Sequence, residues 1–126
     1  MNQVDRKSFG PEYDTVRDYW NSHLHDISVV KAEPGTLEFF DQLNTYRFGK
    51  LHYLPKLVNY GGYSGKKVLE VGCGAAVDSV HFAKDGALVT GIDLADVSIG
   101  LAQKNFGLRN LPGEFLVMNG GIDGVC

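Results

Sequence analysis

The sequence predicts a doubly wound α/β fold, in which helices alternate with the strands of a parallel sheet. Three short runs at 67–71, 87–93 and 114–118 are rich in apolar and β-branched residues. Such near-continuous hydrophobicity is typical of strands that are covered on both faces. The two stretches between these runs repeat apolar residues at helical spacing. Strand, helix, strand, helix and strand in this order form one half of a doubly wound sheet.

The first sixty residues show helical patterns and no strand pattern. Apolar residues recur at spacings of three and four over 13–24, which indicates an amphipathic helix. Thr36 is the expected N-cap of a second helix, and Gly49 its expected end. Pro55 suits the first turn of a shorter third helix that stops at the next pair of glycines.

The 126 residues therefore divide into a helical cap or lid over 1–60 and an α/β domain over 61–126. Apolar residues make up 44% of the chain and charged residues 21%, a composition that builds a hydrophobic core. A formal net charge of −3 gives no basic surface for nucleic acid, and no apolar run is long enough to span a membrane. Two cysteines cannot form a disulfide framework, so we expect a cytoplasmic protein.

The turn after the first predicted strand has the composition of a cofactor-binding loop. Gly72, Cys73 and Gly74 follow the strand directly, and glycines here let the backbone turn tightly and approach a ligand. The next helix offers free N–H groups at its start. Asp93 ends the second strand about 20 residues further on, the separation at which a carboxylate lies beside the same crevice and accepts hydrogen bonds from ribose hydroxyls.

Two residues favour S-adenosylmethionine over a dinucleotide as the ligand of this turn. A dinucleotide fingerprint would place a third glycine at position 77, where the chain has Val77. Glu70 precedes the first glycine by two residues, and a carboxylate attracts the sulfonium and ammonium groups of S-adenosylmethionine but not a pyrophosphate. A nucleotide- or NAD-binding domain of another enzyme is the less favoured alternative.

Three segments resemble the motifs of class I S-adenosylmethionine-dependent methyltransferases. The run 68–74 looks like their first motif and is the most specific match, 89–94 resembles the second motif, and 115–120 resembles the third. In the helical opening, 16–21 and 33–36 are similar to the leading segment of small-molecule methyltransferases of this class. The resemblance covers most of the chain and implies a Rossmann-like fold.

The resemblance also implies S-adenosylmethionine as the cofactor, S-adenosylhomocysteine as its product, and a role for each matching residue. Gly72 and Gly74 would lie against the methionine and ribose portions of the cofactor, in the loop that also contains Cys73. Glu70 would help to hold the methionine ammonium group, directly or through water. Asp93 would accept the ribose hydroxyls.

The remaining matches concern the adenine ring and two departures from the pattern. Leu94 would pack on the adenine ring. Asn119, followed by Gly120, stands where the family usually has an aspartate that reads the adenine amino group, and an amide carbonyl can still accept from that amine. Ala76 stands where a glycine is usual, so its methyl group is expected to narrow the loop.

Structural roles remain open for several of these residues. Asp93 could cap the end of its strand or the next helix, and Glu70 could pair with a backbone amide. Cys73 is better explained as a small packed residue than as a nucleophile, because no base is near it in the sequence. Asp78, near a helix start, suits capping or the helix dipole. The four histidines have no metal-ligand spacing, so we predict no metal site, and no catalytic residue can be assigned.

The resemblance implies four further strands after the third, and these segments usually supply the acceptor site. The chain would then hold the cofactor half of the fold and lack most of the acceptor half, which leaves its enzymatic activity uncertain. The leading hypothesis is a truncated methyltransferase that ancestrally acts on a small-molecule acceptor. The alternative is a non-catalytic remnant that binds S-adenosylmethionine or S-adenosylhomocysteine, or that only oligomerises.

A fold that stops after the third strand would leave the 68–71 strand at an open edge of the sheet. The unpaired edge of an apolar strand readily pairs with another chain. We therefore expect a homodimer that covers this edge, either by pairing the two first strands across a two-fold axis or by exchanging the N-terminal helices.

Overall fold

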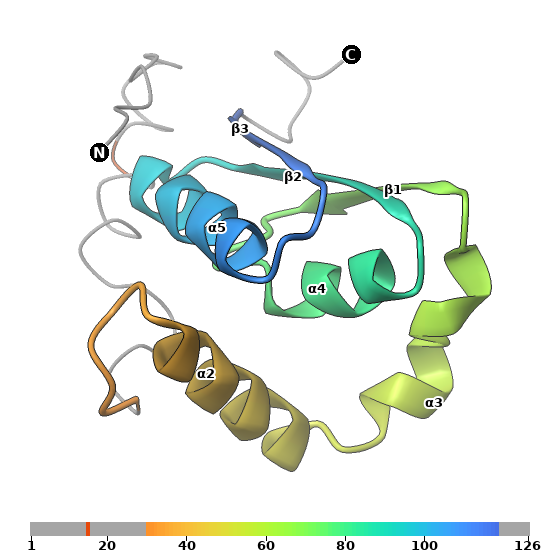
Figure 1. Ribbon diagram of the computed structural model, residues 1–126, viewed down its shortest axis with the longest axis horizontal. Coiled ribbons are helices and arrows are strands. Elements are labelled where there is room, and N and C mark those ends of the chain that lie inside the picture. Colours follow the sequence, from red (N-terminus) through yellow and green to blue (C-terminus); the bar gives the residue numbers. More distant parts are fainter. Residues whose placement is uncertain (1–14, 16–29, 119–126) are drawn as a thin grey trace.

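The computed structural model describes residue 15 and residues 30–118, and it confirms the α/β class (Figure 1). The first part of the described chain is helical, with helices α2 (Leu37–Lys50) and α3 (Leu54–Val58) and the 3₁₀ helix η2 (Tyr60–Tyr63). The second part alternates strands and helices in the predicted order, namely β1 (Lys67–Val71), α4 (Val77–Lys84), β2 (Leu88–Asp93), α5 (Asp96–Leu108) and β3 (Glu114–Val117).

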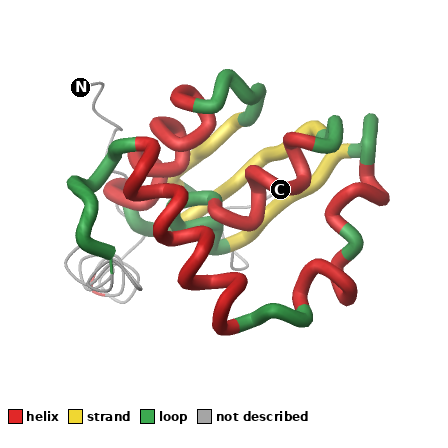
Figure 2. The backbone as a smooth tube through the Cα atoms, turned by 60° about the horizontal axis from the view of Figure 1, so that its bottom comes forward, coloured by secondary structure: helices red, strands yellow, loops and turns green. Residues whose placement is uncertain are grey.

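The three strands form a parallel sheet in the order β1-β2-β3, and Figure 2 shows them running side by side. The pairing of β1 with β2 runs from Lys67 opposite Leu88 to Val71 opposite Ile92. In Figure 1, α4 and α5 lie between the sheet and α2, and α2 contacts both of them. This arrangement brings the carboxyl ends of β1 and β2 together at one edge of the sheet.

The main core lies between the sheet and its two covering helices. Val89, Phe115 and Val117 alternate along the strands toward α4 and α5 and are buried there with Ile99 and Phe106. A second cluster forms where Phe39, Phe40 and Leu43 of α2 pack against Ala75, Val77 and Leu101. The helical segment is therefore joined to the α/β part through apolar contacts beside the turn after β1.

The opposite face of the sheet carries apolar side chains that the described residues leave open. Leu69 is 56% exposed, Val71 60% and Leu88 53%. Val68 packs into the core and Glu70 bonds to α4, so alternation along the strand directs Leu69 and Val71 to the other face. Within the described sheet, β1 has a strand neighbour on one side only. Among the described strands β1 therefore lies at an edge of the sheet, and the exposure and pairing of this edge stay predictions.

Several helix boundaries differ from the sequence-based expectation. The Thr36 hydroxyl accepts from the Phe39 N–H at 3.2 Å, so the N-cap of α2 is confirmed, but the helix continues through Gly49 to Lys50. Its last turn is kept because the Leu51 N–H still donates to the Arg47 carbonyl at 2.8 Å. Asn59 ends α3 in the left-handed conformation, before the expected glycines.

The helix expected over 13–24 and the cap or lid expected over 1–60 involve residues that the structure does not describe. The amphipathic helix expected over 13–24 lies outside the described residues apart from Thr15, so the cap or lid role of 1–60 stays a prediction. In the part of the chain that is described, no helix combines the length and the hydropathy needed to cross a membrane.

Candidate cofactor-binding site

The turn between β1 and α4, residues 72–76, adopts a conformation that depends on small residues. Gly72, Gly74 and Ala76 have φ values of +69°, +55° and +64°, which lie in the left-handed region. The amides of Gly72 and Cys73 donate to the Ile92 carbonyl at 2.8 and 3.1 Å. These bonds anchor the start of the turn at the end of β2, the next strand of the sheet.

Both glycines of the turn border open space. A Cβ atom added at Gly72 or at Gly74 would meet no atom of residues 30–118 within 4 Å, its chain neighbours aside. The space beside the backbone is therefore free, and the positive φ angles are what restrict these positions to glycine. A ligand can approach the main chain closely here, as the sequence indicated.

The carboxylate of Asp93 lies against this turn, at the place that its sequence separation indicated. Its Oδ2 accepts from the Gly74 N–H at 2.9 Å, and its Oδ1 accepts from the Ala95 N–H at 2.9 Å. The second bond shows that Asp93 also shapes the chain just before α5. Each carboxylate oxygen has a further lone pair, so the group can still accept from ligand hydroxyls.

The side chain of Glu70 lies behind the turn and is largely buried. It accepts a hydrogen bond from the hydroxyl of Ser79 in α4, so its partner is a side chain and not a backbone amide. Burial raises the pKa of Glu70 to about 7, although the Ser79 hydrogen bond acts in the opposite direction. Near neutral pH the carboxyl group is therefore poised between its two protonation states.

Beside Glu70, an ion pair that the sequence did not reveal links α2 to the start of α4. The guanidinium of Arg47 reaches Asp78 through two bonds, Nε to Oδ1 at 2.5 Å and Nη2 to Oδ2 at 2.8 Å. The hydrogen bond to Asp78 raises the pKa of Arg47. Asp78 lies in the first turn of α4, as expected of an acid that complements the helix dipole, but its partner is 31 positions away. No local spacing could have indicated this pair.

The other predicted site residues are placed as follows. Cys73 is only 6% exposed, and burial raises the pKa of its thiol, which favours the packed role over a nucleophilic one. Leu94 follows β2 directly and is half-buried. Asn119 and Gly120 lie outside the described residues.

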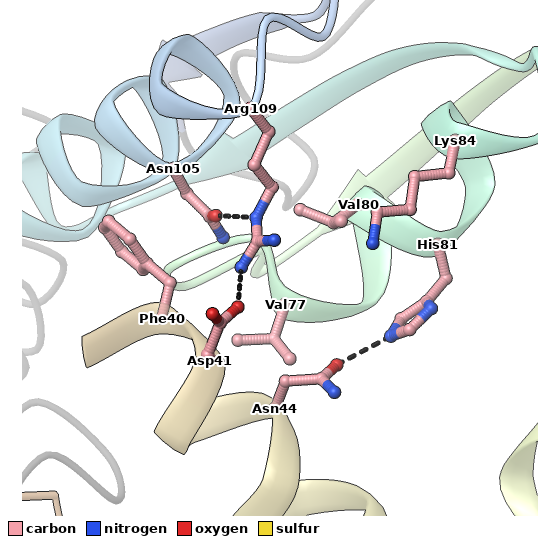
Figure 3. A pocket seen from close by; sticks show the side chains of 9 residues that line it. All are labelled: Phe40, Asp41, Asn44, Val77, Val80, His81, Lys84, Asn105 and Arg109. Atoms are coloured by element: carbon pink, nitrogen blue, oxygen red, sulfur yellow. Dashed lines mark hydrogen bonds and ion pairs between the residues drawn. The ribbon is translucent and has the colours of Figure 1, made fainter. Parts of the chain in front are cut away.

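A small cavity of about 50 Å³ lies between the helices α2, α4 and α5 (Figure 3). Its lining consists of Phe40, Asp41, Asn44, Val77, Val80, His81, Lys84, Asn105 and Arg109. None of the predicted cofactor residues that the structure describes belongs to this lining. Within the described ranges, no group of three or more His, Cys, Asp or Glu residues is arranged to hold a metal ion.

The parallel sheet and its glycine turn define a Rossmann-like fold of the class I methyltransferase type. Solved structures share this fold, among them the magnesium protoporphyrin IX methyltransferase of Synechocystis with bound S-adenosylmethionine. That structure superposes with a TM-score of 0.59 at 24% identity, over 90% of this chain and 57% of its own. No protein-family model matches the chain.

The sequence similarity is to S-adenosylmethionine-dependent methyltransferases of this class. The chain is 42% identical over 105 residues to the ubiquinone biosynthesis O-methyltransferase of Pasteurella multocida, which covers 83% of this chain and 37% of that protein. The enzyme of the same name from Pseudomonas fluorescens is 50% identical over 87 residues, 65% of this chain and 37% of its own. The chain thus spans little more than a third of the length of these curated relatives.

Proposed function

We propose that the chain binds S-adenosylmethionine at the 72–76 turn, as the cofactor-binding part of a methyltransferase for a small-molecule acceptor. The observation that carries the proposal is the contact of the Asp93 carboxylate with the Gly74 N–H at 2.9 Å. It joins the glycine turn and the acid of the next strand into one site at the carboxyl ends of β1 and β2, where ligands bind in open α/β sheets.

The residues of this site fit the chemical groups of the cofactor. Gly72 and Gly74 leave room beside the backbone, and Asp93 keeps acceptor capacity for two ribose hydroxyls. A cationic ammonium near Glu70 would stabilise its ionised form and lower the raised pKa. Bound S-adenosylmethionine supplies an electrophilic methyl group on a sulfonium. These residues orient the donor, while alignment with the acceptor is the main requirement of an in-line displacement.

The acceptor class is inferred from the relatives. The curated relatives above are named as O-methyltransferases of ubiquinone biosynthesis, which supports a small molecule with a hydroxyl group as the acceptor. The described residues offer no group that we assign as catalytic. The location in the cytoplasm remains a prediction that rests on the sparse cysteines.

Calorimetric titration with S-adenosylmethionine and S-adenosylhomocysteine tests the proposal. Wild-type protein is expected to bind both ligands, and Asp93→Ala is expected to weaken binding by at least about tenfold, because it removes the acceptor for the ribose hydroxyls. Asp85→Ala is the matched control, since this exposed acid follows α4 at the opposite end of the parallel strands. Absence of binding by wild-type protein at millimolar ligand would overturn the proposal.

A second measurement separates an enzyme from the alternative, a module that only binds the ligand or oligomerises. Because the chain spans 37% of the curated relatives, turnover by this chain has to be measured separately from binding. Formation of S-adenosylhomocysteine in the presence of hydroxyl-bearing small molecules would establish methyl transfer. Binding without turnover would support a module that only binds the ligand. If the protein shows no binding and no turnover, the oligomerising remnant is the hypothesis that is left.

A further inference from the structure

One residue of the turn has a backbone conformation that its side chain does not favour. Ala76 has φ +64° and is fully buried, and it is the N-cap residue of α4. The left-handed region brings Cβ close to the backbone, so an alanine there is strained where a glycine would not be. A strained residue persists only where its surroundings fix it. Something next to the turn must therefore hold this conformation.

Both ends of the peptide unit that joins Ala75 to Ala76 are bonded. The N–H of Ala76 donates to the Cys73 carbonyl at 2.9 Å, within the turn. The carbonyl of Ala75 accepts from Nδ2 of Asn105, in α5, at 3.0 Å. Because a peptide unit is planar, fixing its two ends sets the rotation about the bonds on either side, which includes φ of Ala76.

The side chain of Asn105 is itself held in one orientation. It is 1% exposed, and its Oδ1 accepts from Nε of Arg109 at 2.7 Å. Arg109 Nη2 pairs in turn with Asp41 of α2 at 2.7 Å (Figure 3). Since the guanidinium only donates, Oδ1 must face Arg109 and Nδ2 must face Ala75. A continuous set of polar contacts thus runs from α2 through α5 to the turn.

We propose that Asn105 is a positioning residue of the cofactor turn, which holds the Ala75–Ala76 peptide so that the turn keeps its binding shape with an alanine at position 76. The proposal rests on the proposed function and deepens it. Asn105 contacts the turn at the Ala75 carbonyl, whereas Asp93 contacts it at the Gly74 N–H, so Asn105 acts only through the backbone. It also accounts for the departure from the usual glycine at this position.

The decisive variant is Asn105→Asp, which keeps the size of the side chain and the acceptor for Arg109 but replaces the donor to Ala75. The expected result at neutral pH is a dissociation constant for S-adenosylmethionine raised about tenfold, as for loss of one buried hydrogen bond. Gln103→Glu is the matched control on the same helix, because this side chain is exposed and does not contact the turn. The control is expected to bind as wild type does.

A second substitution distinguishes positioning from simple packing of α5. Adding Ala76→Gly to Asn105→Asp is expected to recover most of the lost affinity, because glycine takes the left-handed conformation without strain. A defect in helix packing would not be rescued by a change in the turn. Asn105→Ser, whose hydroxyl is too short to reach Ala75, repeats the test should the aspartate variant not fold.

Amide hydrogen exchange gives a readout that needs no ligand. In Asn105→Asp, the Ala76 N–H is expected to exchange about tenfold faster than in wild type, while the Ile99 N–H within α5 exchanges at the same rate. Unchanged exchange at Ala76 in a folded variant would overturn the proposal, as would unchanged affinity in a protein that binds. If wild type does not bind S-adenosylmethionine, the proposed function fails, and exchange at Ala76 still decides the role of Asn105.

Discussion

At the scale of single residues, the protonation of Glu70 couples the site to pH. Burial raises its pKa to about 7, above the ordinary value of 4.5 for an exposed glutamate. The folded protein therefore binds the proton more tightly than the unfolded chain does. The stabilising contribution of the protonated group is complete below pH 4.5 and is lost as the pH rises through 7.

Glu70→Gln keeps a neutral side chain at every pH and should remove this dependence. The free energy of unfolding of the variant, relative to wild type, is expected to increase by about 3 kcal/mol between pH 4 and pH 8. Urea denaturation across that range measures the change. Glu114→Gln, at an exposed acid of β3, is the matched control for the loss of one carboxylate. If the difference in the free energy of unfolding between Glu70→Gln and wild type does not change with pH, the raised pKa of Glu70 is wrong.

Part of the candidate site could be located from the sequence, because its residues follow local spacing rules. The glycines of the turn and Asp93 could be found because a parallel strand pair fixes the spacing between them. Arg47, Asp78 and Asn105 could not be assigned, since their partners lie 30 or more positions away. Such contacts depend on how helices dock, which neither composition nor periodicity specifies.

At the scale of elements, glycines that look alike in the sequence have different reasons to be glycine. Gly91 lies in β2, where an added Cβ would come within 2.6 Å of Cδ1 of Phe115 and 3.0 Å of the Cys73 sulfur. Gly100 lies in α5, where an added Cβ would meet no other part of the described chain within 4 Å. At Gly91 there is no room for a side chain, because Phe115 and Cys73 pack against the backbone. At Gly100 there is room, and the glycine only lowers the stability of the helix.

The same substitution at these two positions should therefore have opposite effects. Gly91→Ala is expected to destabilise the protein by about 1–3 kcal/mol through overpacking against Phe115. Gly100→Ala is expected to stabilise it by about 0.5–1 kcal/mol, because alanine favours the helix. Thermal or urea unfolding of both variants checks the pair. Equal effects would contradict this account of how β2 packs on β3.

The order and type of the strand–helix–strand elements were predictable, since each has its own hydrophobic period. The ends of the helices α2 and α3 were less predictable. Gly49 lies inside the last turn of α2, where the carbonyl of Arg47 still finds an amide partner. Nor did the sequence predict η2, where Tyr60 packs against Phe48, His81 and Phe82 in an aromatic cluster that forms only once α2 and α4 have docked.

At the scale of the whole molecule, the sheet is covered on one face and open at β1 within the described residues. Leu69 and Val71 are more than half exposed on the uncovered face, next to the edge of β1. Apolar edges and faces of this kind drive association with another chain. The homodimer expected from the sequence remains a prediction that this surface supports.

Light scattering after size exclusion tests the dimer directly. Wild-type protein is expected to run at twice the mass of the chain, and Leu69→Lys to run as a monomer, because a charge at the edge strand opposes pairing. Leu57→Lys is the control, since this residue is 73% exposed on α3. A stable wild-type monomer at high concentration would contradict the prediction.

The contacts of the glycine turn also have a consequence for the order of folding. The hydrogen bonds that tie the turn to β2 and α5 all have partners later in the chain, at Ile92, Asp93 and Asn105. The turn is synthesised before these partners, and no residue that precedes the turn supplies these bonds. Contacts between distant positions form slowly, because a loop must be closed before they stabilise anything. We therefore expect the turn proposed to bind the cofactor to reach its final conformation late, after α5 has docked.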